Sequence, residues 1–394
     1  MREGSRRLRI LHVVATYYPA VRYGGPIRSV HGLAAGLARR GHDVHVYTTS
    51  VDGDRDLDVP TDQPVIIDGV HVHYFPVPAL RRLYWSPSLG RRLRQSISGF
   101  DVVHTHGVYL WPLLAAAREA ARAGIPYTVA PRGQLIRDLI SRKSRWIKSA
   151  WIQLFERKTL ALAAAVHVTA EAEGEELHAL GLSARRIACI PNGVDYPQTY
   201  EPLERGPYSG LPARYVLFLS RITWKKGLDR LIEAWQHIAD CPLVIAGNDD
   251  ENYQPQLMDL ARTRGVADRV MFIGEVSDEH KWTLYERAQL FVLPSYSENF
   301  GNVVAEAMAM GCPVVLTPEV GIAPLVRAAG AGVVTDGAPE KLAAVIQELL
   351  LDPARRQEMG RRGAQTARTQ LSWDGIVEST ETLYREMKRR TDRR

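Results

Sequence analysis

Residues 290–313 read LFVLPSYSENFGNVVAEAMAMGCP. The apolar run Leu290–Leu293 predicts a short buried strand that Pro294 ends, and the polar stretch after it predicts a loop. A helix is predicted to begin near Gly301–Asn302. Backbone N–H groups at a helix start, with the positive end of the helix dipole, form a site for phosphate oxygens. The segment therefore predicts a strand–loop–helix unit of a parallel α/β sheet, with an anion-binding loop.

The same alternation of short apolar strands and helices occurs twice along the chain. Near-continuous apolar strands separated by helices of about 10–15 residues are typical of buried parallel sheets. The strands expected in the first half are Ile10–Ala15, Asp43–Thr48, Val65–Tyr74, Val102–His106, Tyr127–Ala130 and Val166–Thr169. Those expected in the second half are Tyr215–Leu219, Leu243–Ala246, Val270–Ile273, Leu290–Leu293, Pro313–Leu316 and Gly332–Val334. The pattern predicts an α/β protein with two Rossmann-like lobes.

The join between the lobes is expected within residues 191–212, which are rich in Pro, Gly, Tyr and Glu and lack a periodic apolar pattern. We expect a first lobe over residues 1–200 and a second over 201–373, with a terminal helix over 374–394 returning to the first lobe. Ligands of open parallel sheets bind outside the carboxyl ends of the strands. We therefore expect the two parallel sheets to face each other across an interdomain cleft.

Length and composition exclude several classes of protein. A chain of 394 residues with 45% hydrophobic and 24% charged residues suits two globular domains and excludes disorder, collagen and coiled coil. The three cysteines lie far apart without a CxxC pair, which argues against a disulfide framework and a structural zinc site. No apolar run reaches the ~18–20 residues of a spanning helix. A cytoplasmic protein is expected.

The net charge of +6 is concentrated in the first half, where residues 1–200 hold 26 basic and 17 acidic side chains. This surplus favours an anionic partner, either lipid headgroups or a phosphorylated substrate. No zinc-finger, RNP or helix-turn-helix motif accompanies the charge, so no nucleic-acid partner is expected.

A basic segment, residues 137–158, carries Ile147, Trp151, Leu154 and Phe155 at helical spacing. Such a helix either lies on an anionic membrane, here the inner face of the cytoplasmic membrane, or packs its apolar stripe into the lobe. Both interpretations remain open at this point.

Two cations follow the first strand of the second lobe, in the segment Ser220–Gly227, SRITWKKG. Arg221 and Lys226 suit the neutralisation of a diphosphate group, although a surface charge run is the alternative. Two carboxylates of the quoted segment have similar alternatives. Glu298 either points toward whatever lies beyond the phosphates or is an acid at a helix start. Glu306 is either a ribose contact or a solvated residue.

These residues form a recognisable pattern. The run R-x4-K-G from Arg221, followed by E-x7-E from Glu298, resembles the retaining family 4 glycosyltransferases of the GT-B fold. The resemblance covers nearly the whole chain, and Ser220 is one departure because the family often has Gly there. The stretch Ala130–Leu135, APRGQL, is similar to the exopolysaccharide and capsule members. Further matching motifs are Tyr23-Gly24-Gly25, Asp101–Gly107 (DVVHTHG), Ile190–Asp195 (IPNGVD) and Ala246-Gly247.

The resemblance implies a role for each matching residue. The catalytic residues it implies are His106, Glu298, Arg221 and Lys226, of which the two cations would hold the diphosphate and the other two would contact the donor sugar. Glu306 would bind the ribose. Arg132 is a candidate contact for an acceptor phosphate or sugar because of its position, directly after the expected strand Tyr127–Ala130. The donor-binding residues it implies are Gly24, Gly25, Asn248, Gly274, Glu275, Val276, Asn299, Phe300, Gly301, Asn302, Val303 and Glu306.

Metal and cofactor sites find little support in the residues themselves. His104 and His106 alternate on one strand and face the same side, but no Cys or clear carboxylate partner completes a zinc ligand set. No Asp-x-Asp motif is present either. The pair Gly24-Gly25 allows close approach to a ligand, or simply a tight turn. We expect no metal and no cofactor apart from the nucleotide sugar.

The resemblance implies a glycosyltransferase that moves a sugar, with retention, from a UDP- or GDP-sugar to a glycan or a polyprenyl-diphosphate-linked acceptor. A role in cell-surface polysaccharide synthesis is expected. The alternatives are a sugar-nucleotide epimerase or hydrolase on the same fold, and a non-catalytic two-lobe binding protein.

Overall fold

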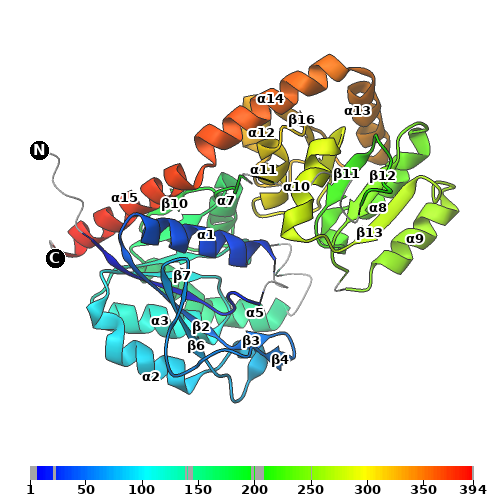
Figure 1. Cartoon of the computed structure of the whole chain (residues 1–394). Helices are drawn as coiled ribbons and strands as arrows, with labels where there is room; N and C mark the ends of the chain where they lie inside the picture. Colours follow the sequence, from blue (N-terminus) through cyan, green and yellow to red (C-terminus); the bar gives the residue numbers. More distant parts are fainter. Residues whose placement is uncertain are drawn as a thin grey trace, which may run out of the picture. The chain divides into compact units, whose positions relative to one another are not determined.

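The computed structural model describes residues 7–20, 24–137, 140, 145–196, 199, 208–249 and 251–392 (Figure 1). The chain divides into two compact units. Unit 1 comprises Met1–Gly193 and Trp373–Arg394, and unit 2 comprises Val194–Ser372. Each unit is an α/β structure with a largely parallel sheet, so the predicted fold class is confirmed. The expected boundary at residues 200–201 lies outside the described residues, and the two units divide at 193–194.

The sheet of unit 1 has eight strands in the order β10-β9-β8-β7-β1-β2-β6-β5. All neighbouring pairs are parallel except β5 and β6. The strands are β1 (Arg9–Val14), β2 (Asp43–Thr49), β5 (Val65–Ile67), β6 (Val70–Phe75), β7 (Val102–His106), β8 (Tyr127–Ala130), β9 (Ala165–Val168) and β10 (Ile187–Cys189). A separate two-stranded ribbon consists of β3 (Val51–Asp52) and β4 (Arg55–Asp56).

The prediction of a single strand over Val65–Tyr74 is wrong. The structure has an antiparallel hairpin of β5 and β6 with Asp68 and Gly69 at its turn, where φ is 48° and 80°. Two consecutive positive φ angles are what a tight hairpin turn requires, and Asp-Gly is a favoured pair for it. The apolar residues on both sides masked this signal. The edge strand β10 was not predicted, because three residues are too few to show a period.

Helices cover both faces of the sheet in unit 1 (Figure 1). They are α1 (Gly25–Arg39), α2 (Pro87–Ser96), α3 (Trp111–Arg122), α5 (Arg145–Trp151), a π-helical turn (Ile152–Glu156), α6 (Arg157–Leu162), α7 (Glu171–Ala179) and α15 (Trp373–Asp392). Successive residues of a strand point to opposite faces of the sheet. Ile10 and Val14 accordingly join an apolar cluster with α1 and α15, whereas Leu11 and Val13 join one with α2 and α3.

Helix α15 is an integral part of unit 1 because α1 approaches it very closely. A Cβ atom on Gly32 would lie 2.2 Å from the Trp373 side chain, and one on Gly36 would lie 2.4 Å from the Val377 side chain. Only glycine fits at such a contact. The terminal helix therefore completes the same unit that begins with β1.

The sheet of unit 2 has six parallel strands in the order β13-β12-β11-β14-β15-β16. They are β11 (Val216–Leu219), β12 (Leu243–Ala246), β13 (Val270–Gly274), β14 (Leu290–Leu293), β15 (Val314–Leu316) and β16 (Gly332–Val334). Each was predicted to within one residue at either end. The sheet grows from β11 through β12 to β13 on one side, and from β14 to β16 on the other. The order of the strands thus reverses between β11 and β14.

Seven α-helices accompany the described part of this sheet. They are α8 (Leu228–Ala234), α9 (Gln254–Thr263), α10 (Asp278–Arg287), α11 (Asn302–Ala309), α12 (Ala323–Ala329), α13 (Pro339–Leu351) and α14 (Pro353–Gln370). The helices α12 and α14 were not predicted. In α14 a Cβ on Gly360 would lie 2.0 Å from the Gly311 carbonyl oxygen, so the helix packs through small residues rather than an apolar stripe. Among the described residues, no helix combines the length and apolar character needed to cross a bilayer.

Candidate functional site

The carboxyl edge of the unit 2 sheet brings together residues that are far apart in the sequence. Ligands of open α/β sheets bind at this edge, where the order of the strands reverses. Strand β11 ends at Leu219 and its neighbour β14 ends at Leu293. The segments that follow, residues 220–227 and 294–301, are the two that the sequence predicted to bind a nucleotide sugar.

A backbone hydrogen bond and a side-chain ion pair connect residues 220–227 with residues 294–301. The Tyr296 N–H donates to the Lys225 carbonyl at 2.7 Å. Lys226 forms an ion pair with Glu298, although 72 residues separate them. Their side chains are only 12% and 19% exposed. Glu298 is therefore a partly buried carboxylate with a fixed cationic partner rather than a simple acid at a helix start.

Gly227 allows the cationic loop to approach the other segment. Its φ is 69°, and a Cβ there would lie 2.0 Å from the Pro294 carbonyl oxygen. Any other residue would push the two segments apart. The glycine thus keeps Lys226 within reach of Glu298.

Three neighbouring strand ends align beside Arg221, which is exposed. The Gly247 N–H donates to the Gly274 carbonyl at 2.8 Å, and the Ile222 N–H donates to the Asn248 carbonyl at 2.8 Å. A Cβ on Gly247 would lie 1.7 Å from the Ser220 carbonyl oxygen, so this turn also requires glycine. Of the predicted residues, Asn248 consequently follows β12, Gly274 ends β13, and Glu275 and Val276 follow β13, next to the loop that carries Arg221.

Glu306 lies on α11, and both of its carboxylate oxygens have partners. The Lys281 ammonium lies 2.7 Å from Oε1, and the Tyr285 hydroxyl donates to Oε2 at 3.1 Å. The Lys281 and Glu306 side chains are 7% and 13% exposed. The alternative of a solvated Glu306 is therefore wrong. Sequence reasoning missed Lys281 and Tyr285, because a lysine in a polar helical segment gives no sign that it is buried.

The loop before α11 and the start of that helix contain both buried and half-buried side chains. Gly301 caps the helix with φ of 99°. Phe300 is buried in the apolar core, and its carbonyl accepts from the Ile322 N–H at 2.9 Å. Any ligand contact of Phe300 must therefore be made by its backbone. The other predicted residues, Asn299, Asn302 and Val303, are half-buried.

In unit 1 the strand order reverses between β1 and β7, and His106 is the last residue of β7. His106 is the register partner of Val14 at the end of β1. Gly24 caps helix α1 with φ of 75°, and Gly25 is the first residue of that helix. Tyr23 lies outside the described residues. His106 thus ends β7, and the glycine loop follows the neighbouring strand β1. A ligand contact of this loop remains a prediction.

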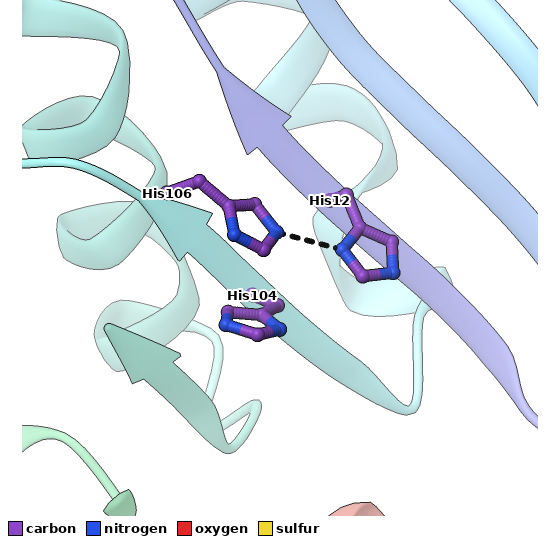
Figure 2. A group of neighbouring side chains, drawn as sticks. All are labelled: His12, His104 and His106. Atoms are coloured by element: carbon purple, nitrogen blue, oxygen red, sulfur yellow. Dashed lines mark hydrogen bonds between the residues drawn. The ribbon is translucent and has the colours of Figure 1, made fainter. Parts of the chain in front are cut away.

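Four buried histidines lie next to one another in this sheet, and we call them the histidine layer. They are His12, His104, His106 and His167. Figure 2 shows the first three, which come from β1 and β7, with a hydrogen bond of 2.9 Å between His12 Nδ1 and His106 Nε2. Burial lowers the pKa of every member, to about 3 for His12 and for His167. The layer is uncharged at neutral pH.

Nitrogen atoms of His12, His104 and His106 lie within 4.8 Å of one another, a spacing that can suit a metal ion. Sequence reasoning considered only His104 and His106 and so missed the third histidine. However, His104 Nδ1 is hydrogen-bonded to the Tyr384 hydroxyl at 2.7 Å. Both ring nitrogens of His106 are also hydrogen-bonded, Nε2 to His12 and Nδ1 to Arg132. The residues present favour a hydrogen-bonded layer over a metal site.

Arg132 follows β8 and points its guanidinium at the histidine layer. It donates to His106 Nδ1 at 3.1 Å and to the Asn192 side-chain oxygen at 2.7 Å. Burial lowers the pKa of Arg132 to about 10. The guanidinium is engaged within unit 1, and the predicted contact of Arg132 with an acceptor remains a prediction.

The basic segment of unit 1 exposes apolar side chains. Trp146, Ile147 and Leu154, which we call the apolar surface patch, are 80%, 73% and 68% exposed. Ile152, in contrast, is buried. The alternative in which the stripe packs into the lobe is therefore wrong for Ile147 and Leu154. Residues 138–139 and 141–144 of the segment lie outside the described residues.

Two family models match the chain, one in each unit. Residues 24–193 match the glycosyl transferase 4-like domain, and residues 209–366 match the glycosyl transferases group 1. Together the two matches cover most of the chain.

Individual relatives agree with the family models. A D-inositol 3-phosphate glycosyltransferase of Xylanimonas cellulosilytica is 28% identical, with 93% of each chain covered. A GDP-mannose:cellobiosyl-diphosphopolyprenol alpha-mannosyltransferase of Xanthomonas campestris is 26% identical, with 84% of this chain and 83% of the relative covered. The crystal structure of Anabaena HepE in complex with UDP and glucose superposes with a TM-score of 0.74 at 21% identity, covering 96% of this chain and 99% of that one. This last likeness concerns the fold.

Proposed function

The chain belongs to the glycosyltransferases of the GT-B fold, and from that premise we propose that it transfers a sugar from a nucleotide-diphosphate sugar to a glycan or lipid-linked glycan with retention of configuration. The observation that carries the proposal is the meeting of Lys226, Glu298 and the Arg221 loop at the carboxyl edge of the unit 2 sheet. The proposal that the anomeric configuration is retained rests on the resemblance to family 4.

In this proposal unit 2 binds the donor. Arg221 and Lys226 bind the diphosphate and stabilise the negative charge that develops on it as the sugar leaves. Lys226 can do so without a divalent cation, since its ammonium supplies positive charge beside the phosphates. Glu298 accepts hydrogen bonds from hydroxyls of the donor sugar. Glu306, held by Lys281, accepts from the ribose hydroxyls.

The nucleotide is proposed to be uridine or guanosine diphosphate. The Anabaena neighbour holds UDP and glucose, and the Xanthomonas relative is named for GDP-mannose. No described contact separates the two nucleotides.

The acceptor is proposed to bind to unit 1, and to be a glycan or a polyprenyl-diphosphate-linked glycan used in cell-surface polysaccharide synthesis. The Xanthomonas relative is named for a diphosphopolyprenol acceptor. The apolar surface patch lies on a segment rich in basic residues, a combination that suits an anionic membrane. These two observations support the proposal that the protein acts at the inner face of the cytoplasmic membrane.

A thermal-shift panel of UDP, GDP, ADP and dTDP, each with excess EDTA, tests the donor site. A nucleotide at about 100 times its Kd stabilises the protein by about 2.7 kcal/mol. For a domain of the size of unit 2, this raises the melting temperature by about 5–10 °C. We expect one nucleotide to do so in the wild type and in Lys341→Met, a variant of an exposed lysine, but much less in Lys226→Met. Equal shifts in all three proteins would contradict the proposed diphosphate site.

Transfer is then distinguished from hydrolysis or epimerisation with the matching nucleotide sugar. Incubation with a lipid-linked acceptor should yield a glycosylated lipid. Free sugar released at the same rate without any acceptor would instead identify a hydrolase, and a changed sugar on the nucleotide would identify an epimerase.

A further inference from the structure

The hydrogen bonds of the histidine layer determine which nitrogen of each ring carries the proton. Arginine has five N–H donors and no acceptor. The Arg132 guanidinium approaches His106 Nδ1 at 3.1 Å, so this nitrogen must accept and carries no proton. In a neutral imidazole the proton then resides on Nε2.

The assignment extends from His106 to His12. Since His106 Nε2 carries the proton, it donates to His12 Nδ1 at 2.9 Å (Figure 2). The proton of His12 is thereby placed on its own Nε2. That nitrogen is buried and has no hydrogen-bond partner among the described residues.

A second set of bonds independently orders the remaining histidines. His167 Nε2 lies 2.9 Å from the Ile190 carbonyl, which can only accept, so the proton of His167 is on Nε2. His167 Nδ1 accepts from His104 Nε2 at 3.4 Å. His104 Nδ1 must then accept from the Tyr384 hydroxyl at 2.7 Å. All four rings are consistent with one neutral, proton-ordered arrangement.

We propose that Arg132 is a positioning residue that fixes neutral His106 in the Nε2–H tautomer against His12. The assignment of tautomers stands without the proposed function, whereas its effect on catalysis rests on that function. His106 ends the strand at the strand-order reversal of unit 1, where ligands of such sheets bind. With both ring nitrogens hydrogen-bonded, to Arg132 and to His12, a fixed tautomer keeps the His106 ring in the same orientation in every turnover.

The surroundings of His106 oppose its protonation. The titratable groups that face it are Arg132, His12 and His104, with His167 and Tyr384 beyond them. Arg132 is positive and the histidines are neutral. Glu173, beside Arg132, accepts hydrogen bonds from the backbone N–H groups of Gly133 and Thr169 and from the Thr169 hydroxyl. A proton or a metal ion at His106 Nδ1 would face the guanidinium and would have to displace it.

Nitrogen-15 NMR of histidine-labelled full chain reports the tautomers directly, with His106→Gln used to assign the His106 signals. We expect an unprotonated Nδ1 and a protonated Nε2 for His106 in the wild type, constant between pH 5.5 and 8.5. In Arg132→Met the ring should lose this preference, through mixed tautomers or a proton gained within that pH range. Arg132→Lys restores an N–H donor and should restore the tautomer.

Arg91→Met, on the exposed face of α2, is the matched control and should leave the His106 signals unchanged. Tyr384→Phe provides a second test, because it removes the donor to His104 and should change the His104 signals while the His106 tautomer persists. A protonated Nδ1 on wild-type His106, an unchanged tautomer in Arg132→Met, or stoichiometric zinc that shifts the signals of His12, His104 and His106 would each overturn the inference.

Steady-state kinetics provide the catalytic readout. Arg132→Met should lower kcat by about ten- to a hundredfold, the loss of one hydrogen bond to a charged group, while the donor KM changes far less. Arg132→Lys should recover part of kcat. If the expected tautomers are found in a protein that transfers no sugar, the proposed function fails and the positioning role of Arg132 stands.

Discussion

Replacement of Lys281 by methionine tests whether the buried ion pair with Glu306 stabilises unit 2. The substitution keeps the length of the side chain but leaves the Glu306 carboxylate, 13% exposed, with the Tyr285 hydroxyl as its remaining described partner. Loss of one partner of a buried pair costs about 3–5 kcal/mol, and the remaining hydrogen bond and partial exposure reduce this to about 2–3 kcal/mol. For a unit of the size of unit 2 the melting temperature should fall by about 4–12 °C.

Differential scanning calorimetry of the full chain measures this change. Lys341→Met is the control, because its pair with Asp336 is exposed, and it should shift the melting temperature little. The double variant Lys281→Met/Glu306→Gln removes the uncompensated charge and should recover part of the loss. If Lys281→Met melts like the Lys341→Met control, the argument that burial makes this pair important is refuted.

Three further predictions concern the donor loop, the membrane and pH. Gly227→Ala should lower the melting temperature and weaken nucleotide binding more than Gly265→Ala, because both glycines have positive φ but only a Cβ at 227 would lie 2.0 Å from the Pro294 carbonyl oxygen. The left-handed backbone alone costs about 1–2 kcal/mol in either variant, so equal losses of stability in the two variants would argue against a tight contact at Gly227. Replacing the three residues of the apolar surface patch by serine should abolish flotation with anionic liposomes while the melting temperature stays unchanged. A wild-type protein that shows no preference for anionic vesicles would contradict the membrane proposal. Unfolded histidines take up protons below pH about 6.5, whereas the pKa values of native His12 and His167 are about 3. The free energy of unfolding should therefore fall as the pH is lowered from 6.5 toward 3, by up to about 1.4 kcal/mol per pH unit for each histidine. Urea midpoints that are equal at pH 7.5 and 5.0 would contradict this prediction.

The strands of unit 2 could be predicted closely because parallel strands buried on both faces are continuous apolar runs with polar loops between them. The placement of Lys226 and Glu298 at one edge of the sheet could also be predicted, but their ion pair depends on β11 and β14 being neighbours, an order that the sequence did not reveal. The partners of Glu306 could not. Lys281 belongs to a helix whose sequence, DEHKWTLYER, shows no apolar stripe, so only the fold reveals that the lysine is buried.

The histidine layer shows the same limit more sharply. The His-x-His pair on β7 was visible in the sequence, but His12 and His167 stand alone on their strands among apolar residues. An isolated histidine in an apolar strand carries no sign of its neighbours across the sheet. The register of β1 with β7 places His12 directly opposite His104, and His167 on β9 joins the layer through its hydrogen bond to His104.

The return of α15 to unit 1 has a consequence for how the protein is made. During synthesis the ribosome releases all of Val194–Ser372 before Trp373, so unit 2 can fold in the nascent chain while unit 1 still lacks the helix that packs against Gly32 and Gly36. Until then, the apolar face of α1 that later meets α15 is uncovered. Such a surface on a growing chain is a natural site for a chaperone, and a frameshift or stop codon beyond residue 372 would leave unit 2 whole but unit 1 incomplete.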